Sequence, residues 1–300
     1  MYSLTNKNAG PEACSLYQYI NSIRGKAILS GQQEFPGDHN HGEELAYIRQ
    51  VSGHSPAILG LDYISNDFEG VNRRAIAWHQ KGGIVSICWH WGIPPYGLGY
   101  PSSQETIDMK ELLTPGTELY QGLLDNLDLV ANALKELQEE NVPVLWRPLH
   151  EFDGGWFWWG KCGPQLFIQL WRLMYDRFTN LHQLNNLIWV LGYSGEMRDG
   201  WYPGDAYVDC IGGDAYSDGI HEELYHWVTK QTSKDMPVCH HENGPLPEPG
   251  LMRDLKVEWC WFLTWHTIHI HKQNSADYVN YVYNHPYVIT LEDLQREKPF

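Results

Sequence analysis

The sequence predicts an α/β fold, a single (β/α)8 TIM barrel that occupies all of residues 1–300. Eight short runs rich in β-branched and aromatic residues alternate with segments of helical periodicity, which is the pattern of a parallel barrel. A chain with 43% hydrophobic and 19% charged residues can bury the large core that such a barrel needs. Because no low-complexity linker divides the chain, we predict one domain.

The predicted strands lie at 27–32, 56–63, 83–90, 143–151, 186–193, 208–216, 237–242 and 258–265. Between the third and the fourth strand, apolar residues repeat at helical spacing: Leu119, Leu123, Leu127, Val130, Leu134 and Leu137. This helix is expected to stop at Asn141 and Pro143, where a buried strand begins. A second helical repeat follows the fourth strand, at Phe167, Leu170, Met174 and Phe178.

The segments that follow strands are long and rich in Gly, Pro and aromatic residues, at 92–103, 152–163, 194–205 and 243–250. In a parallel barrel these segments gather at the C-terminal face, where active sites are built. The chain has 14 Trp and 18 Tyr against 8 Phe. Trp and Tyr combine a flat face with a polar edge, so their surplus points towards a surface that binds sugar.

The formal charge of −16, from 21 basic and 37 acidic residues, argues against nucleic acid or an anionic membrane as partner. There is no run of 18 apolar residues that would span a bilayer. Residues 1–13 lack the charged and apolar regions of a signal peptide, which leaves open a mature secreted chain or a cytosolic protein.

Six cysteines occur in the chain. Four of them lie within apolar, strand-like runs and are predicted to be buried thiols: Cys88, Cys210, Cys239 and Cys260. Cys14 and Cys162 lie in less regular sequence, where a disulfide stays open.

Two glutamates end strands that lie almost opposite each other in the predicted barrel, Glu151 on the fourth and Glu242 on the seventh. Two carboxyls that face each other across a cleft are the minimum equipment for glycoside hydrolysis. A strand-end glutamate is more often a cap or a salt-bridge partner, and the pairing on two strands is what favours a catalytic role.

Counting back by twos along the strands groups the side chains that share a face with these glutamates. It puts Arg147 and Leu149 with Glu151, and Val238 and His240 with Glu242. The same count predicts that His90, Asp214 and Tyr216 point inward. We therefore expect these polar groups to converge at the mouth of the barrel.

A metal-dependent hydrolase is an alternative hypothesis to a glycoside hydrolase, because the chain has 15 His with three close pairs: His39/His41, His240/His241 and His269/His271. A catalytic metal needs imidazoles and carboxylates that converge on one point. The first pair falls in a loop, the second points to opposite faces and the third lies past the last strand. We expect no metal and no other cofactor.

Residues 146–160, WRPLHEFDGGWFWWG, resemble glycoside hydrolase family 26, best known for endo-β-1,4-mannanases. The resemblance extends over nearly the whole chain. Its further segments, in order, are LSGQQE at 29–34, WHW at 89–91, NNLIWV at 185–190, WYPGDAYVD at 201–209, GGDAYSD at 212–218, HENGPLPEP at 241–249 and YNHPYVIT at 283–290. The chain departs from the family pattern at Phe152 and Asp153, and His266 occupies a position that varies between members.

The resemblance implies that Glu151 is the general acid/base and Glu242 the nucleophile of a retaining double displacement, with the carboxyls about 5 to 5.5 Å apart. It implies that Tyr216 hydrogen-bonds Glu242 and favours its ionised form. The residues implied to line the subsite of the cleaved sugar are His90, His150 and Asp214, with Trp156 and Trp265 as its aromatic walls. We also expect Trp156, Trp158 and Trp159 to exclude water from Glu151 and so raise its pKa.

The predicted function is therefore a retaining endo-β-1,4-mannanase that acts on mannan, glucomannan or galactomannan. The resemblance also implies a secreted enzyme, expected to be a monomer, whose partner is a neutral β-mannan or manno-oligosaccharide. The alternatives on the same scaffold are a β-1,3-xylanase and a mixed-linkage β-glucanase. A non-catalytic carbohydrate-binding barrel would be expected to lack one of the two carboxylates. Neither the preferred mannan nor endo cleavage against release of mannobiose follows from the sequence.

Overall fold

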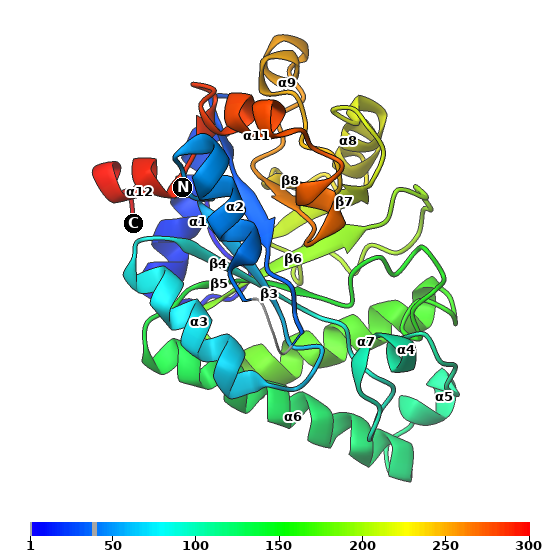
Figure 1. The fold of residues 1–300 in the computed structure, drawn as a ribbon. Coiled ribbons are helices and arrows are strands. Elements are labelled where there is room, and N and C mark those ends of the chain that lie inside the picture. The colour runs from blue at the N-terminus through cyan, green and yellow to red at the C-terminus, as the bar shows by residue number, and fades with distance from the viewer. Residues whose placement is uncertain (1, 38–40) are drawn as a thin grey trace.

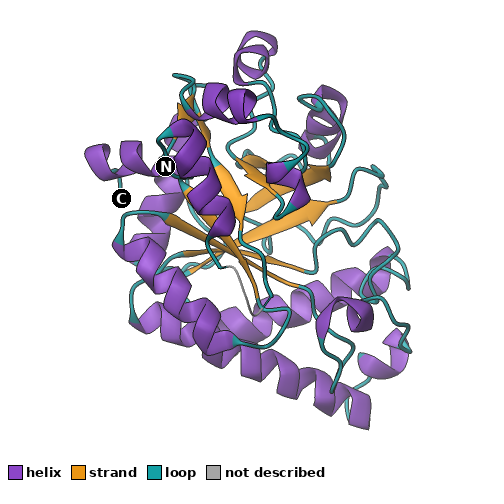
Figure 2. Ribbon diagram, viewed as in Figure 1, coloured by secondary structure: helices purple, strands orange, loops and turns teal. Residues whose placement is uncertain are grey.

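The computed structural model describes residues 2–37 and 41–300, so His39 of the first histidine pair lies outside the described residues. Eight parallel strands close into a barrel whose strand order follows the sequence, from β2 to β9. Helices surround the barrel (Figure 1), and Figure 2 shows the strands gathered at the centre of the molecule. The predicted (β/α)8 barrel is confirmed.

Each predicted strand overlaps an observed barrel strand. The barrel strands are β2 (Gly31–Gln33), β3 (Ile58–Asp62), β4 (Ile84–Trp89), β5 (Val144–Pro148), β6 (Leu187–Tyr193), β7 (Cys210–Ala215), β8 (Val238–Asn243) and β9 (Phe262–Thr264). The first predicted strand is divided at Ser30: β1 (Ile28–Leu29) pairs with β10 (Val288–Ile289) outside the barrel. Ser30 hydrogen-bonds the Ile289 carbonyl through both its amide and its hydroxyl, so the chain joins β10 before it enters the barrel.

The helices are α1 (Pro11–Ile23), α2 (Glu43–Ser52), α3 (Phe68–Gln80), α4 (Gly99–Ser103), α5 (Met109–Leu112), α6 (Glu118–Glu139), α7 (Pro164–Asp176), α8 (Glu222–Thr229), α9 (Pro249–Leu255), α10 (Ile268–His271), α11 (Ala276–Tyr283) and α12 (Leu291–Glu297). Both helical repeats seen in the sequence are confirmed. The Thr117 hydroxyl caps α6 by accepting the Tyr120 N–H, and the chain leaves the helix at Asn141 with a φ of 59°. Helix α7 continues into a π-helix, η1 (Arg177–Leu181).

The core has two parts. One lies between the strands and the surrounding helices, and it contains most of the buried Trp side chains. The other fills the barrel interior with small and branched residues and continues into α1, whose Leu16, Tyr17 and Ile20 are buried against it. Helix α1 therefore packs at the end of the barrel away from the strand-end glutamates.

All six cysteines are free thiols, and the four predicted to be buried are buried. The disulfide left open at Cys14 or Cys162 does not form. In residues 2–37 and 41–300, no helix has both the length and the apolar character required to span a bilayer.

Candidate active site

A cavity of about 660 Å³ opens at the C-terminal ends of the strands. Both strand-end glutamates line it, together with aromatic and histidine side chains from the loops. Its lining residues are Phe35, Pro36, Asp62, Ile64, His90, Tyr100, Glu151, Trp156, Phe157, Tyr216, Glu242, Trp265, His266 and His269.

Glu151 reaches the cavity through a turn, which corrects the expected alternation along its strand. Strand β5 ends at Pro148, and both Leu149 and Glu151 adopt a φ of 50° in the left-handed region. The Glu151 amide donates a hydrogen bond to the Gly192 carbonyl at 2.8 Å, which ties the turn to β6. Leu149 consequently packs in the outer core and does not share a face with Glu151.

The carboxyl of Glu151 is set up to hold a proton near neutral pH. Burial, followed by the negative charge of Glu242, raises its pKa to about 7. The indole Nε1–H of Trp156 donates to Oε2 at 2.9 Å and works in the opposite direction. Trp156 reaches the carboxyl directly, whereas Trp158 and Trp159 are fully buried, do not line the cavity and donate to the carbonyls of Trp91 and His150.

Glu242 is carried into the barrel by an irregularity in β8. The pairing register shifts between His240 and Asn243, so the alternation predicted for this strand is also wrong. His240 faces the helices, where its ring stacks on Trp259 at 5.3 Å. Only 2% of Glu242 is exposed, but it lines the floor of the cavity.

Two donors hold the Glu242 carboxylate from opposite sides. Tyr216 donates its hydroxyl to Oε2 at 2.5 Å, as the resemblance implied. Arg147 donates Nη1–H to Oε1 at 2.7 Å. Two such bonds fix the orientation of the carboxylate.

Counting by twos along the strand predicts that Arg147 shares a face with Glu151, but it does not predict what the guanidinium binds. Arg147 is fully buried and also donates through Nη2 to the Asp214 carboxylate. A Cβ at Gly192 would lie 2.7 Å from its Nε, so glycine is needed beside it. A lone arginine in the middle of an apolar strand could have indicated this role, because a buried guanidinium needs carboxylate partners.

The structure brings the three carboxylates of Glu151, Asp214 and Glu242 together, with one oxygen of each within 4.8 Å of the others. Retaining glycosidases keep their two carboxyls about 5 to 5.5 Å apart, whereas inverting enzymes need about 6.5 to 9.5 Å to admit a water. The separation of Glu151 and Glu242 therefore fits direct attack by one carboxylate on the sugar.

Of the expected subsite residues, His90, Trp156, Tyr216 and Trp265 line the main cavity. His150 does not, which corrects its expected place: it is fully buried behind His90, with its Nε2 3.9 Å from Glu242 Oε1. Asp214 is also absent from this lining.

A second hollow of about 380 Å³ adjoins the cavity and shares Glu151, Trp156 and Tyr216 with it. Asp214 lines this hollow but not the main cavity. The hollow is completed by residues of the loops after β6 and β7, among them Ser194, Glu196, Ser217 and His221. Glu151 thus lines both the main cavity and the second hollow.

The two residues at which the chain departs from the family pattern do not reach the cavity. Phe152 stacks on Phe167 at 4.2 Å, and Asp153 accepts the Ser194 amide at 2.7 Å. They fasten the loop that carries Glu151 to its neighbours, so the departures concern packing.

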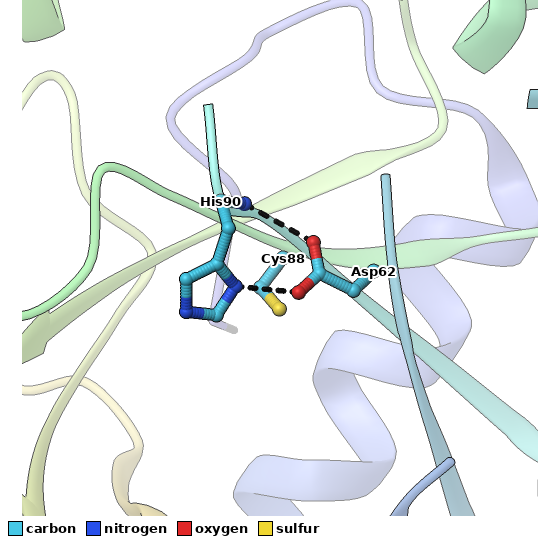
Figure 3. A group of neighbouring side chains, drawn as sticks. All are labelled: Asp62, Cys88 and His90. Carbon is cyan, nitrogen blue, oxygen red and sulfur yellow. Dashed lines mark hydrogen bonds and ion pairs between the residues drawn. The ribbon is translucent and has the colours of Figure 1, made fainter. Parts of the chain in front are cut away.

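Two groups of metal-ligand type gather among the described residues, and neither has the geometry of a metal site. In the first, Glu151, Asp214 and Glu242, the charge is met by the Arg147 guanidinium. In the second, Asp62 Oδ2 and His90 Nδ1 are 2.5 Å apart (Figure 3). Ligands at about 2.0 to 2.1 Å around a tetrahedral ion stand farther apart than this.

Residues 5–293 match the family model for glycosyl hydrolase family 26. A mannan endo-1,4-beta-mannosidase of Thermothelomyces thermophilus is 35% identical over 98% of this chain, which spans 63% of that relative's length. The crystal structure of a Podospora anserina GH26-CBM35 β-(1,4)-mannanase superposes with a TM-score of 0.88 at 36% identity, covering 98% of this chain and 69% of that one.

The crystal structure of a β-mannanase from a symbiotic protist of the termite Reticulitermes speratus, complexed with gluco-manno-oligosaccharide, is also similar. It has a TM-score of 0.88 at 30% identity and covers 97% of both chains. The family model, the related sequences and the related structures agree with the paired carboxylates at the barrel mouth: the chain belongs to glycosyl hydrolase family 26.

Proposed function

We propose that this chain is a retaining endo-β-1,4-mannanase that hydrolyses internal bonds of mannan, glucomannan or galactomannan. The observation that carries the proposal is the pair Glu151 and Glu242, with carboxylate oxygens within 4.8 Å in one cavity. The names of its relatives support mannan as the substrate, and one related structure holds a gluco-manno-oligosaccharide. Secretion and a monomeric state belong to the same proposal.

In the first step Glu151 donates its proton to the glycosidic oxygen while Glu242 attacks the anomeric carbon. The C–O bond to the leaving sugar breaks, and a glycosyl–Glu242 ester forms. Arg147 and Tyr216 keep the attacking carboxylate aligned through their hydrogen bonds. Because the pKa of Glu151 is about 7, its carboxyl is protonated below pH 7. This is the proton that Glu151 transfers to the leaving sugar.

In the second step Glu151, now ionised, removes a proton from a water molecule that attacks the anomeric carbon. The ester breaks, Glu242 is released as a carboxylate and the product keeps the β configuration. Each step inverts the anomeric centre once, so the overall result is retention.

The shape of the site supports cleavage within a chain. The main cavity meets a hollow of about 380 Å³ at Glu151 and another of about 430 Å³ at Phe35. These adjoining spaces can hold sugars of the chain before and after the cleaved bond. Mannan is neutral, so the formal charge of −16 neither attracts nor repels it.

The test is the variant Glu242→Ala, assayed on mannan with and without sodium azide. Hydrolysis should fall by several orders of magnitude because the nucleophile is gone, and azide should restore turnover with an α-mannosyl azide as product. Azide would occupy the space of the lost carboxylate, on the face opposite the leaving sugar.

The matched control is Glu136→Ala, which removes a carboxylate on α6 that bonds Asn72 outside the cavity. This variant should keep wild-type activity. Activity near wild type in Glu242→Ala would contradict the nucleophile assignment. Wild-type hydrolysis of xylan or lichenan in preference to mannan would contradict the substrate.

A further inference from the structure

Asp62 is a buried residue at the end of β3, and both oxygens of its carboxylate accept hydrogen bonds. Oδ1 accepts the amides of Ile64 at 3.0 Å and His90 at 3.1 Å, and Oδ2 meets His90 Nδ1 at 2.5 Å. Figure 3 shows the carboxylate and the imidazole pointing towards each other, with both bonds between them drawn. Because the backbone amides fix the carboxylate, the carboxylate fixes the plane of the His90 ring.

The contact continues beyond the His90 ring. Its second nitrogen, Nε2, lies 3.1 Å from Nε2 of His150, and that atom lies 3.9 Å from Glu242 Oε1. Asp62, His90 and His150 thus form a line from β3 to the carboxylate that attacks the sugar. His90 also lines the cavity beside Glu151.

A single proton can lie between the two Nε2 atoms, which limits the states of the pair. When His90 is charged, it donates to Asp62 through Nδ1 and to His150 through Nε2. When His90 is neutral, its proton stays on Nδ1 beside Asp62, and His150 becomes the donor. In both states Asp62 requires a proton on His90 Nδ1.

We propose that Asp62 is a positioning residue of the reaction: it fixes the ring and the positive charge of His90, and through that charge it weakens the hold of Glu151 on its proton. The proposal rests on the proposed hydrolysis, in which Glu151 is the acid. A cation at His90 favours the anionic form of Glu151, so it limits how strongly Glu151 holds its proton.

The electrostatics of the neighbourhood agree with this geometry. Burial opposes a charge on His90, but the Asp62 carboxylate and its hydrogen bond, with Glu242 and Glu151, raise the pKa of His90. Burial, then the charges of His90 and Arg147, lower the pKa of His150 well below the ordinary value. The remaining titratable groups that face His90 are Cys88 on its own strand, Tyr100, and His266 after β9.

Wild-type protein with ¹⁵N-labelled histidine tests the first half of the proposal by NMR, without any activity assay. His90 should show a strongly deshielded Nδ1 proton and should titrate above free histidine. A neutral ring protonated on Nε2, or titration below free histidine, would overturn the proposal even if no variant folds.

The variant Asp62→Asn tests the second half. Its amide can still accept the two backbone N–H groups but presents an NH₂ to His90 Nδ1, so the charge on His90 is lost. Without that charge the pKa of Glu151 rises, and the alkaline limb of kcat/KM on mannan should move up by about one pH unit while kcat falls.

Asp209→Asn is the matched control, because Asp209 is a buried carboxylate that accepts the amides of Thr5 and Trp189 just before β7, away from His90. It should leave the limb in place. An Asp62→Asn enzyme that is merely slower, with the limb unmoved or shifted down, would overturn the positioning role. A wild-type enzyme inactive on mannan would instead refute the proposed function and leave the NMR result standing.

Discussion

Glu151 combines two features that a catalytic acid needs, a proton near neutral pH and a fixed direction. Its fixed direction comes from a left-handed turn after Pro148 and from the hydrogen bond that the Glu151 N–H donates to the Gly192 carbonyl. The sequence singles out this residue and Glu242 because each stands at the C-terminal end of a predicted strand, and the family resemblance supplies their roles. The turn and the β8 irregularity could not, since period-two counting assumes a regular strand.

The first prediction concerns Trp156→Phe. The phenyl ring keeps an apolar wall but removes the N–H that donates to Glu151 Oε2 and lowers the pKa of that carboxyl. The pKa should rise from about 7, so Glu151 stays protonated to higher pH and the alkaline limb of kcat/KM moves up. The pH profile on a soluble manno-oligosaccharide measures this shift. A limb that moves down would contradict the assigned hydrogen bond.

The second prediction separates the acid from the nucleophile. Glu151→Ala should slow hydrolysis of mannan by about 10²- to 10⁴-fold, because the leaving sugar then departs without a proton. Aryl mannosides with an acidic phenol should keep a fast first step, seen as a burst of phenol. Azide should give the β-mannosyl azide, the opposite anomer from that expected of Glu242→Ala. Equal loss on both substrates would count against the acid role.

At the scale of elements, α6 and the end of α7 are joined by one charged cluster. Arg177 donates through Nε and Nη2 to the two oxygens of Asp128, each at 2.6 Å, and His182 Nε2 lies 2.6 Å from the same carboxylate. Partial burial works against the charge, but the hydrogen bonds from Arg177 and His182 lower the pKa of Asp128. The bidentate pair holds η1 against α6.

The third prediction is that Asp128→Asn lowers the free energy of unfolding by about 1 kcal/mol at neutral pH, a modest value because the carboxylate is partly exposed. The pKa of Asp128 is lower in the folded state, so its contribution is present above the unfolded pKa and is lost as pH falls through the folded one. Urea titrations of both proteins should therefore converge at low pH.

Asp125→Asn, an exposed change in the same helix, is the control: its side chain accepts a hydrogen bond from Gln121 and makes no bidentate pair with Arg177, so stability should change much less. A gap between wild type and Asp128→Asn that stays constant down to acid pH would show that the pair is not the source of the stability.

The strands and the two long helical repeats could be predicted because burial imposes clear periodicities on them. The split of the first strand at Ser30 and the π-helix after Asp176 could not. Both depend on partners distant in sequence: Ile289 pairs beside Ser30, and Asp128 fixes Arg177.

For the whole molecule, the cavity at the barrel mouth and the hollow that adjoins it form a groove lined by loops that follow different strands. The two spaces that share Glu151 are the reason to expect cleavage within a chain. From the sequence we predict the fold, the C-terminal face as the place of the active site and the aromatic residues that gather there. The depth of the pocket could not be predicted, because loop lengths do not say which side chains remain exposed. His150 is the clearest case, since it lies beside the acid and yet is fully buried.

The fourth prediction is a product profile on mannohexaose. An open groove allows several binding registers, so early products should include mannotriose as well as mannobiose and mannotetraose. Chromatography of the first few per cent of reaction measures the distribution, with xylan and lichenan as controls. Mannobiose and mannotetraose alone, released from one end, would contradict the open groove.

The most direct test of the account is to trap the covalent intermediate on the wild-type enzyme. A 2-deoxy-2-fluoro-mannoside with a fluoride leaving group slows both steps and lets the ester accumulate, and mass spectrometry of peptides locates it. The account predicts one fluoromannosyl group on Glu242 and recovery of activity as the ester hydrolyses. A label on another residue, or inactivation without any ester at Glu242, would contradict it.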